Sequence, residues 1–391
     1  MPRIEELDDD ALLELSRRTD ELAVLSVYVN AQPGQEPNLE GVAIDLKNRY
    51  RELQNRVGED GWGDRGREVS AALERLRVQV ESLASPREPG RGRILFAALG
   101  EDWVLRLESA MPVPTRVVLD DGPFIHPLLE LLDEGRPAGA VLVSTDDARV
   151  LEWRLGRLRP LGRMEQAEVE APHERTGQIG GGPPGQFHTP MREQRQARQR
   201  DRTERFLDRV VSVAAELAAG RGWERILVSG GDRWTEPAAA GFPEQLRDKV
   251  LRDPRVLGGL DEAALADEVT ERLQEEHDAQ EQRLVEHVRD AALSQGGALG
   301  LSEVVAALGS GRVAHLVYDP EVRYAGSVSA DGTLFAGEET GPDGRPGTPE
   351  PRLTERLVEQ ALATGARVSP VEGAAQGILA EAAGIAALLR W

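Results

Sequence analysis

The sequence is organised around residues 173–209, HERTGQIGGGPPGQFHTPMREQRQARQRDRTERFLDR. The first part of this stretch is a cluster of glycines and prolines that ends at Gln186: Gly177, Gly180, Gly181, Gly182, Pro183, Pro184 and Gly185. Glycine has no Cβ and proline has no backbone N–H, so this cluster fits neither a helix nor a strand ladder. We therefore expect a loop that projects from its domain, followed almost at once by an arginine-rich helix.

That helix is expected from about Arg192 to Ala219, and its two halves differ. The first half is charged and carries Arg192, Arg195, Arg198, Arg200, Arg202, Arg205 and Arg209. The second half carries apolar residues at helical spacing, which predicts packing on a sheet: Phe206, Val210, Val213, Ala214 and Leu217. Two interpretations of the first half stay open. It is either a solvated helix, whose arginines are partly offset by interspersed acids, or a contact for RNA or phosphate.

Composition limits the classes of function. The 391-residue chain has a formal net charge of -21, which argues against a protein that coats nucleic acid indiscriminately, because phosphate binding depends on Lys and Arg. Any RNA contact should be confined to a basic patch. No apolar run approaches the roughly 20 residues of a membrane span, and residues 1–10 lack the apolar core of a signal peptide. We expect a soluble cytoplasmic protein without a membrane partner.

The chain has no cysteine, which excludes disulfides, thiolate metal sites and a cysteine nucleophile. Its six histidines show no spacing of the HExxH kind, which would place two imidazoles on one metal ion. No metal site and no cofactor is therefore expected.

The remaining pattern predicts an α/β protein of three domains. Residues 1–135 alternate apolar strands and amphipathic helices, with a loop between two helices at residues 58–66 and a sheet that is antiparallel in part. Residues 138–255 give a strand meander, the glycine loop, the long helix and a buried strand. Residues 256–290 form an acidic helical connector, expected as two helices, and residues 291–391 form an α/β/α sandwich.

Two familiar phosphate-binding motifs fail to explain the glycine loop. A P-loop needs Lys and Ser or Thr after its glycines, and the two prolines here remove donors that would hold a phosphate. A Rossmann fingerprint needs an apolar strand before the glycines, where this chain is acidic. Gln186 at the loop's tip remains as a chemical group: in a narrow RNA-lined cavity, its amide could orient a water onto an ester carbonyl. The alternative is a surface loop without chemistry.

The order of strand meander, Gly185–Gln186 loop and arginine helix, followed by SEVVAALGSGRVAHLVYD and a terminal GIAALLRW, resembles the superfamily of archaeal and eukaryotic peptide release factor 1 and Pelota. More narrowly, it is similar to the bacterial Vms1-like release factors and the related ribosome hibernation factors. The resemblance covers residues 138–391 well and the first 135 residues loosely.

The resemblance implies a three-domain ligand of the ribosomal A site. The middle domain would be RNase H-like and would carry the loop to the peptidyl transferase centre, where Gln186, supported by Gly185, promotes hydrolysis of peptidyl-tRNA. The seven arginines of the helix would lie against large-subunit RNA. The last domain would be L7Ae-like, and in relatives it meets a translational GTPase.

Two departures from the family pattern keep alternatives open. The release factors have Gly-Gly-Gln at the tip, whereas Pro184 precedes Gly185 here, fixing φ and removing a donor. The N-terminal domain lacks the Asn-Ile-Lys-Ser motif, so stop-codon reading is not expected. The sequence therefore predicts a codon-independent peptidyl-tRNA hydrolase of ribosome rescue. A non-catalytic hibernation factor that plugs the A site is the alternative, and a protein unconnected with ribosomes is a third possibility.

Overall fold

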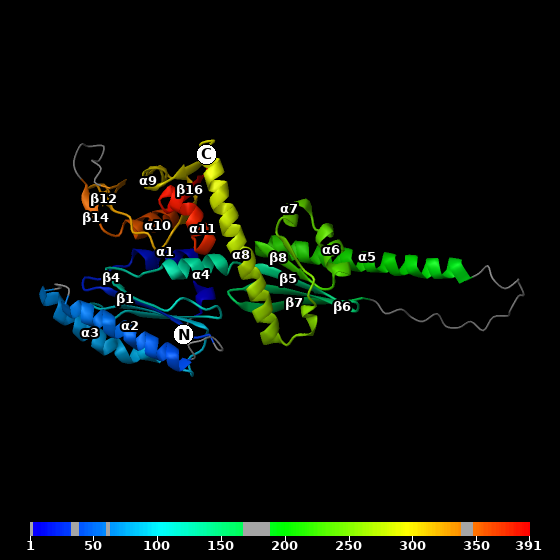
Figure 1. Cartoon of the computed structure of the whole chain (residues 1–391), viewed down its shortest axis with the longest axis horizontal. Coiled ribbons are helices and arrows are strands. Elements are labelled where there is room, and N and C mark those ends of the chain that lie inside the picture. The colour runs from blue at the N-terminus through cyan, green and yellow to red at the C-terminus, as the bar shows by residue number, and fades with distance from the viewer. Residues whose placement is uncertain (1–2, 33–38, 60–62, 167–187, 338–346) are drawn as a thin grey trace, which may run out of the picture. The chain divides into compact units, whose positions relative to one another are not determined.

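The computed structural model describes residues 3–32, 39–59, 63–166, 188–337 and 347–391. Contacts between Cα atoms divide the chain into two compact units (Figure 1). The first unit combines Met1–Gly135 with Gln274–Trp391, and the second is Arg136–Leu273. The fold is mixed α/β, as the sequence predicts.

The N-terminal part of the first unit is a four-stranded sheet with helices on one face. The strand order is β3-β2-β1-β4, and each neighbouring pair is antiparallel, so the partly antiparallel sheet expected from the sequence is antiparallel throughout. Its elements are η1 (Ile4–Glu6), α1 (Asp9–Arg17), β1 (Val24–Asn30), α2 (Leu39–Glu59), α3 (Gly63–Ser82), β2 (Gly92–Ala98), β3 (Val104–Ser109), β4 (Arg116–Asp120) and α4 (His126–Glu134).

Helices α2 and α3 bury their apolar stripes on this sheet, and Leu46, Tyr50 and Leu73 lie in the shared core with Val27 (Figure 1). Tyr50 donates its hydroxyl to the backbone oxygen of Leu73 at 2.6 Å. The loop expected at residues 58–66 is shorter than predicted, because α2 continues to Glu59 and α3 begins at Gly63.

The C-terminal part of the first unit contains two further sheets, with orders β10-β16-β11-β15 and β13-β12-β14. Only β11 and β15 pair in parallel in the first of these. The elements are β10 (Gly297–Leu299), α9 (Leu301–Gly309), β11 (Val313–Tyr318), β12 (Gly326–Val328), β13 (Leu334–Ala336), β14 (Thr348–Glu350), α10 (Leu353–Ala363), β15 (Arg367–Pro370), α11 (Gly373–Leu379), η3 (Ala380–Ala382) and β16 (Ile385–Leu389).

Helix α4 follows the N-terminal strands in sequence but packs on the C-terminal sheet. Its buried Asp133 accepts hydrogen bonds from Arg367, with Nη2 at 2.8 Å, and from the hydroxyl of Ser369. His315 of β11 lies 2.8 Å from the same hydroxyl through Nε2. This buried network joins α4 to β15 and β11 and makes the two parts of the first unit one body.

The second unit is a five-stranded sheet of order β7-β6-β5-β8-β9. The meander β5-β6-β7 is antiparallel, whereas β5, β8 and β9 run parallel. The elements are β5 (Ala138–Val143), β6 (Asp147–Arg154), β7 (Arg157–Glu165), α5 (His188–Arg221), β8 (Arg225–Ser229), α6 (Asp232–Gly241), α7 (Glu244–Arg247), β9 (Val250–Asp253), η2 (Leu257–Gly259) and α8 (Glu262–Ala292).

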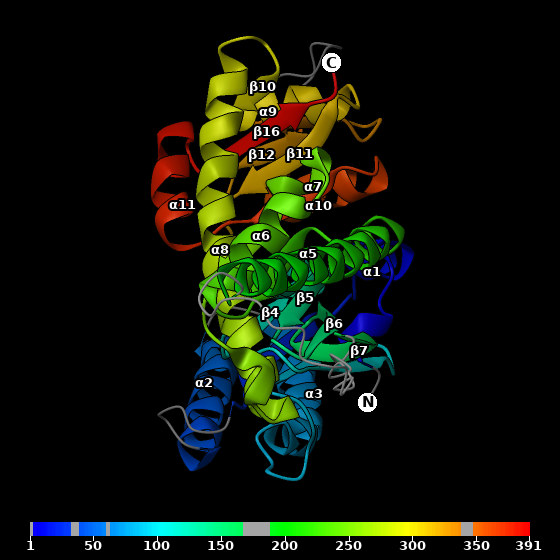
Figure 2. The same cartoon turned by 90° about the vertical axis from the view of Figure 1, so that its right-hand side faces the viewer.

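Helix α5 is the crossover between β7 and β8, and its C-terminal half covers one face of the sheet (Figure 2). Burial of Phe206, Val210 and Ala214 confirms these members of the predicted apolar anchor, whereas Val213 and Leu217 are only partly buried. Leu207, Val211 and Ala218 complete the buried face. The helix ends where Gly222 takes a φ of 66° and the N–H of Trp223 bonds the oxygen of Ala218 at 3.0 Å. This is the Schellman arrangement, which needs a residue that tolerates a left-handed backbone.

The acidic segment after the sheet is one helix and not the two expected from the sequence. Helix α8 runs unbroken over 31 residues, from Glu262 to Ala292, because this stretch contains neither glycine nor proline. Its residues up to Leu273 belong to the second unit, where Trp153 donates Nε1–H to Thr270 at 2.8 Å.

Candidate nucleic-acid interface

The structure describes some of the predicted site residues and not others. Gly185 and Gln186 lie outside the described residues. Arg192 and Arg195 belong to α5, but their side chains also lie outside the described part of the chain. The other predicted residues, Arg198, Arg200, Arg202, Arg205 and Arg209, are all described and all exposed.

Four of these arginines lie on one strip of α5. Successive residues of an α-helix turn by about 100°, so Arg198, Arg202, Arg205 and Arg209 fall within about 60° of one another. The acids Asp201, Glu204 and Asp208 occupy a separate strip beside them. We call the set Arg198, Arg202, Arg205 and Arg209 the basic strip. The acids still offset part of this charge, because Asp201 lies three residues from Arg198 and four from Arg205, which are neighbouring positions on a helix surface.

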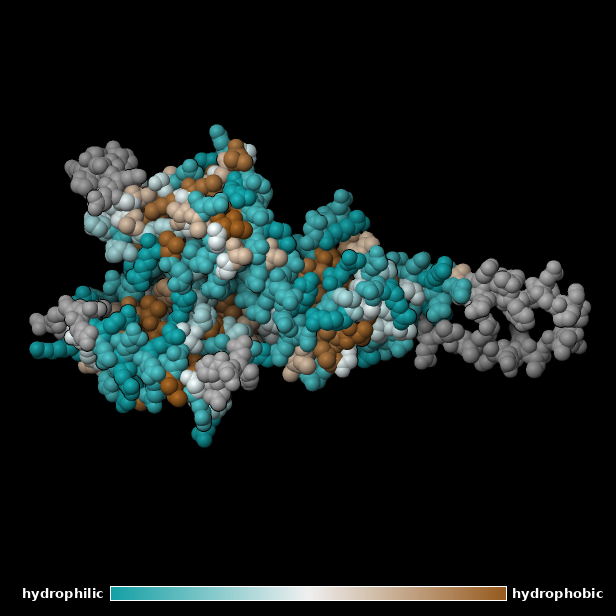
Figure 3. Space-filling model, in the orientation of Figure 1, coloured by the Kyte–Doolittle hydropathy of each residue, from teal (hydrophilic) through white to brown (hydrophobic). Residues whose placement is uncertain are grey.

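Arg200 does not belong to the basic strip. It lies on the opposite side of α5 and lines a shallow hollow with Gln196, Thr203 and Pro237 of α6. Seven arginines counted along the sequence therefore do not form one surface. The outer part of α5 appears as mainly hydrophilic surface in Figure 3.

The C-terminal end of the basic strip is fixed to the strand that leads into the loop. The Nη2 of Arg209 donates to the backbone oxygen of Glu165, the last residue of β7, at 3.1 Å. Its guanidinium also lies 5.9 Å from the ring centre of Phe206, the first buried residue among the described side chains of the helix. The C-terminal end of β7 thus lies beside the basic strip.

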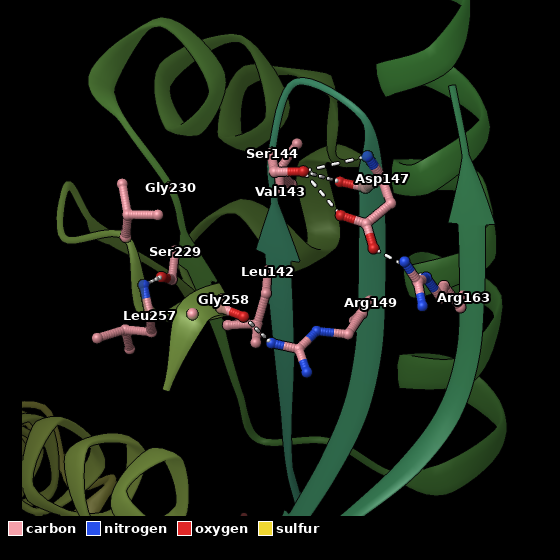
Figure 4. Close-up of a pocket in the computed structure, with 12 residues that line it drawn as sticks. Leu142, Val143, Ser144, Asp147, Arg149, Arg163, Ser229, Gly230, Leu257 and Gly258 are labelled. Atoms are coloured by element: carbon pink, nitrogen blue, oxygen red, sulfur yellow. Dashed lines mark hydrogen bonds and ion pairs between the residues drawn. The ribbon is translucent and has the colours of Figure 1, made fainter. Parts of the chain in front are cut away.

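A second feature of this unit was missed by sequence reasoning. A cavity of about 370 Å³ lies at the carboxyl ends of β5 and β8, lined in part by Arg149 and Arg163 (Figure 4). Ser229 is buried at its base and donates to the backbone oxygen of Arg255 at 2.8 Å. Ser144, directly after the buried run AVLV, and Ser229, at the end of the buried run RILVS, were the available signal, because strand ends of a parallel pair meet at one edge.

Beside this cavity, Asp253 and Arg255 form a tight pair, with Nη2 and Oδ2 at 2.7 Å. Burial by itself raises the pKa of Asp253, but hydrogen bonds from Arg255 outweigh it and hold the pKa below its usual range. The pKa of Arg255 is raised mainly by its hydrogen bond with Asp253. The pair is therefore ionised, and it fixes the turn between β9 and η2.

The described residues show neither a metal site nor a membrane-spanning helix. Among them, no three His, Asp or Glu side chains gather in a way that could hold a metal ion. None of the helices in those ranges is both long enough and apolar enough to cross a membrane.

With this geometry in view, residues 123–278 match the model of bacterial archaeo-eukaryotic release factor family 10. Residues 123–278 therefore belong to the release-factor and Pelota superfamily. The matched range contains the whole sheet of the second unit, α5 and the cavity. No curated protein sequence matches the chain.

Solved structures of the same superfamily are also similar to the chain. An archaeal translation termination factor, aRF1, is 18% identical, with 100% of this chain and 98% of that chain covered at a TM-score of 0.27. Pelota of Archaeoglobus fulgidus is 16% identical, with 77% and 79% covered and a TM-score of 0.33. Dom34 of S. cerevisiae is 11% identical, with 75% of each chain covered and a TM-score of 0.39.

Proposed function

We propose that this protein is a release-factor-like ligand of cytoplasmic ribosomes that hydrolyses peptidyl-tRNA without reading a codon. The observation that carries the proposal is the basic strip on α5 within a release-factor domain. A net charge of -21 disfavours contact with RNA over most of the surface, so a one-sided arginine strip directs the contact.

In this proposal the basic strip binds phosphates of large-subunit RNA at the A site and positions the domain. From Arg198 to Arg209 it extends about 17 Å along the helix axis, enough to meet several phosphates. Arginine suits this task because its planar guanidinium makes bidentate hydrogen bonds to phosphate oxygens. Such contacts fix orientation without reading sequence.

The reaction is assigned to the loop tip. The side-chain amide of Gln186 positions a water against the ester carbonyl that joins the peptide to tRNA, and Gly185 allows the backbone its geometry. Backbone N–H groups of the tip stabilise the oxyanion. A translational GTPase as a further partner stays a prediction of the family resemblance.

The second candidate function is a non-catalytic hibernation factor, and Pro183 and Pro184 favour it. Each proline removes one N–H from the tip, and these are groups that an oxyanion site would use. A tip with fewer donors would serve as a plug over the catalytic centre of an idle ribosome.

A release assay tests the catalytic assignment. Stalled ribosomes carrying labelled peptidyl-tRNA are mixed with the protein, and free peptide is measured over time. Gln186→Ala should slow release by about 100-fold or more, whereas Gln178→Ala, a matched change in the same segment, should not alter it. Equal release by Gln186→Ala and the unchanged protein would show that Gln186 is not catalytic.

The hibernation candidate predicts a different pair of results. The unchanged protein would sediment with vacant ribosomes and yet release no peptide above the buffer control. A protein unconnected with ribosomes would fail to sediment with them at moderate salt. Arginine–phosphate contacts should still hold at that salt concentration, and they weaken steeply as the salt concentration rises.

A further inference from the structure

The cavity at the carboxyl ends of β5 and β8 has the size and position of a small-molecule site. Its volume of about 370 Å³ falls in the range of roughly 300–1,000 Å³ that such sites occupy. It opens between the β5–β6 turn, which begins at Ser144, and the short helix η2 (Figure 4).

The topology of the sheet explains why a hollow forms there. After β5 the chain turns to β6 on one side, whereas after β8 it continues through α6 to β9 on the other side. Connections that diverge from adjacent parallel strands leave a crevice outside their carboxyl ends, and ligands of open α/β sheets bind in such crevices. Gly230 permits the divergence, since its φ is 147° and a Cβ would lie 2.4 Å from the oxygen of Val143.

The charges that line the cavity favour an anion. Arg163 pairs with Asp147, with Nε and Oδ2 at 2.9 Å, and Ser144 donates its hydroxyl to the other carboxylate oxygen at 2.7 Å. Asp147 is thus already neutralised. Arg149 supplies a second cation with no carboxylate partner among the residues that line the cavity.

Arg149 is held in place by the wall of the cavity. Its Nη2 donates to the backbone oxygen of Gly258 at 2.7 Å, which orients the guanidinium beside η2. A guanidinium has five N–H donors, so one hydrogen bond leaves most of them for a ligand. Preorganised arginine of this kind is the side chain best matched to a phosphate group.

The remaining wall is apolar and gives room for more than a phosphate. Leu142, Val143, Val256 and Leu257 line it, and Val256 keeps 67% of its surface exposed. Gly259 also lines the cavity, and a Cβ built on it meets no atom within 4 Å. An aliphatic wall facing an arginine suits a flat heterocycle with a charged substituent.

We infer that this cavity binds a nucleoside monophosphate unit, with the phosphate on Arg149 and Arg163 and the base against Val256 and Leu257. The unit comes either from a free nucleotide or from an unpaired nucleotide of RNA. The inference does not rest on the proposed hydrolysis, because none of its residues belongs to the loop tip or to the basic strip.

Calorimetric titration of the full chain tests the inference. The probes are AMP and GMP, the corresponding nucleosides, inorganic phosphate and a short single-stranded RNA. A nucleoside monophosphate should bind, and both the nucleoside and inorganic phosphate should bind at least about tenfold more weakly. If the RNA binds and the free nucleotides do not, and Arg149→Gln removes the binding, the unit is supplied by RNA.

Three variants locate the binding. Arg149→Gln and Arg163→Gln should each weaken it by about tenfold, and Gly259→Leu should weaken it by adding bulk to the cavity lining. Gly309→Leu, at another glycine with no atom within 4 Å of its Cβ, is the matched control and should bind normally. Thermal melting shows whether each variant is folded.

Three results would overturn the inference. The first is that no nucleotide or RNA binds at about 1 mM. The second is that inorganic phosphate competes as well as the nucleotide. The third is that nucleotide binding survives unchanged in both Arg163→Gln and Gly259→Leu.

Discussion

The Nδ1 of His126 lies 2.6 Å from the hydroxyl of Tyr318, and the two residues stand 192 positions apart in the chain. Both side chains are buried. Burial raises the pKa of Tyr318 well above its usual value, so the phenol is neutral and can donate to the imidazole. The Nε2 of His126 then faces Glu355 at 3.6 Å. One histidine of α4 thereby connects β11 and α10.

Removing this hydroxyl should destabilise the first unit. Tyr318→Phe keeps the ring but leaves Nδ1 of His126 buried without its partner, which costs about 1–3 kcal/mol. Urea unfolding monitored by circular dichroism would measure the loss. Tyr324→Phe is the matched control, because the Tyr324 hydroxyl is buried without a hydrogen-bond partner, and its loss should cost less. Equal costs for the two variants would contradict this account.

The acid Glu130 should make stability fall as pH rises. Burial is the main cause that raises its pKa from 4.5 to about 9, and the nearby carboxylates of Glu372, Glu134 and Glu281 add to it. Because the folded-state pKa is the higher one, the stabilisation is complete below about pH 4.5 and is lost as pH rises towards 9.

Glu130→Gln should therefore stabilise the protein by about 1–3 kcal/mol at pH 8 and have little effect at pH 5. Chemical unfolding at both pH values gives the comparison. Glu286→Gln replaces an exposed glutamate of α8 and should change neither value. A Glu130→Gln effect of the same size at both pH values would exclude proton linkage as its cause.

Gly139 should not tolerate even a methyl group. A Cβ at this position of β5 would lie 2.2 Å from the ring of Trp223, which is fully buried. Gly139→Ala should cost about 1–3 kcal/mol or more through overpacking. Gly220→Ala, in α5 with no atom near its Cβ, should stabilise by up to about 1 kcal/mol. If both changes had the same sign in denaturant unfolding, the packing of Trp223 on Gly139 would be refuted.

Binding to ribosomes should depend on which side of α5 an arginine occupies. Arg202→Gln combined with Arg205→Gln should weaken co-sedimentation and reduce the slope of log affinity against log salt by about 1–2. Arg200→Gln removes one charge from the other side of the helix and, compared with Arg202→Gln alone, should have little effect. An equal loss in Arg200→Gln would show that the helix acts through total charge.

The periodicity of the sequence was sufficient to predict structure where the contacts lie within one helix. The apolar half of α5 was predicted from helical spacing, and burial of Phe206, Val210 and Ala214 confirms it. Its predicted end near Ala219 rested on Gly220 and Gly222 in the sequence, because a left-handed residue after a helix favours glycine. The division of the arginines between two sides of α5 could also have been predicted, since Arg198, Arg202, Arg205 and Arg209 recur every three or four residues. It was missed because the charges were counted along the sequence without their positions around the helix.

Contacts between residues far apart in the sequence could not be predicted in this way. Nothing near His126 or Asp133 indicates that their partners are Tyr318 and Arg367, because sequence patterns report burial but not which surfaces meet. The cavity was missed for the same reason: its arginines come from β6 and β7, and its wall comes from η2. The single helix α8 was predicted wrongly as two, although its composition contains no residue that breaks a helix.

The partial burial of α5 also has a mechanical consequence. Among the described side chains of this 34-residue helix, none from Gln196 to Arg205 is buried, so a stretch of about 15 Å precedes the buried Phe206. A tilt of about 5° at Phe206 would displace Gln196 by about 1 Å. Small adjustments of packing between α5 and the sheet would therefore be magnified along the exposed part of the helix.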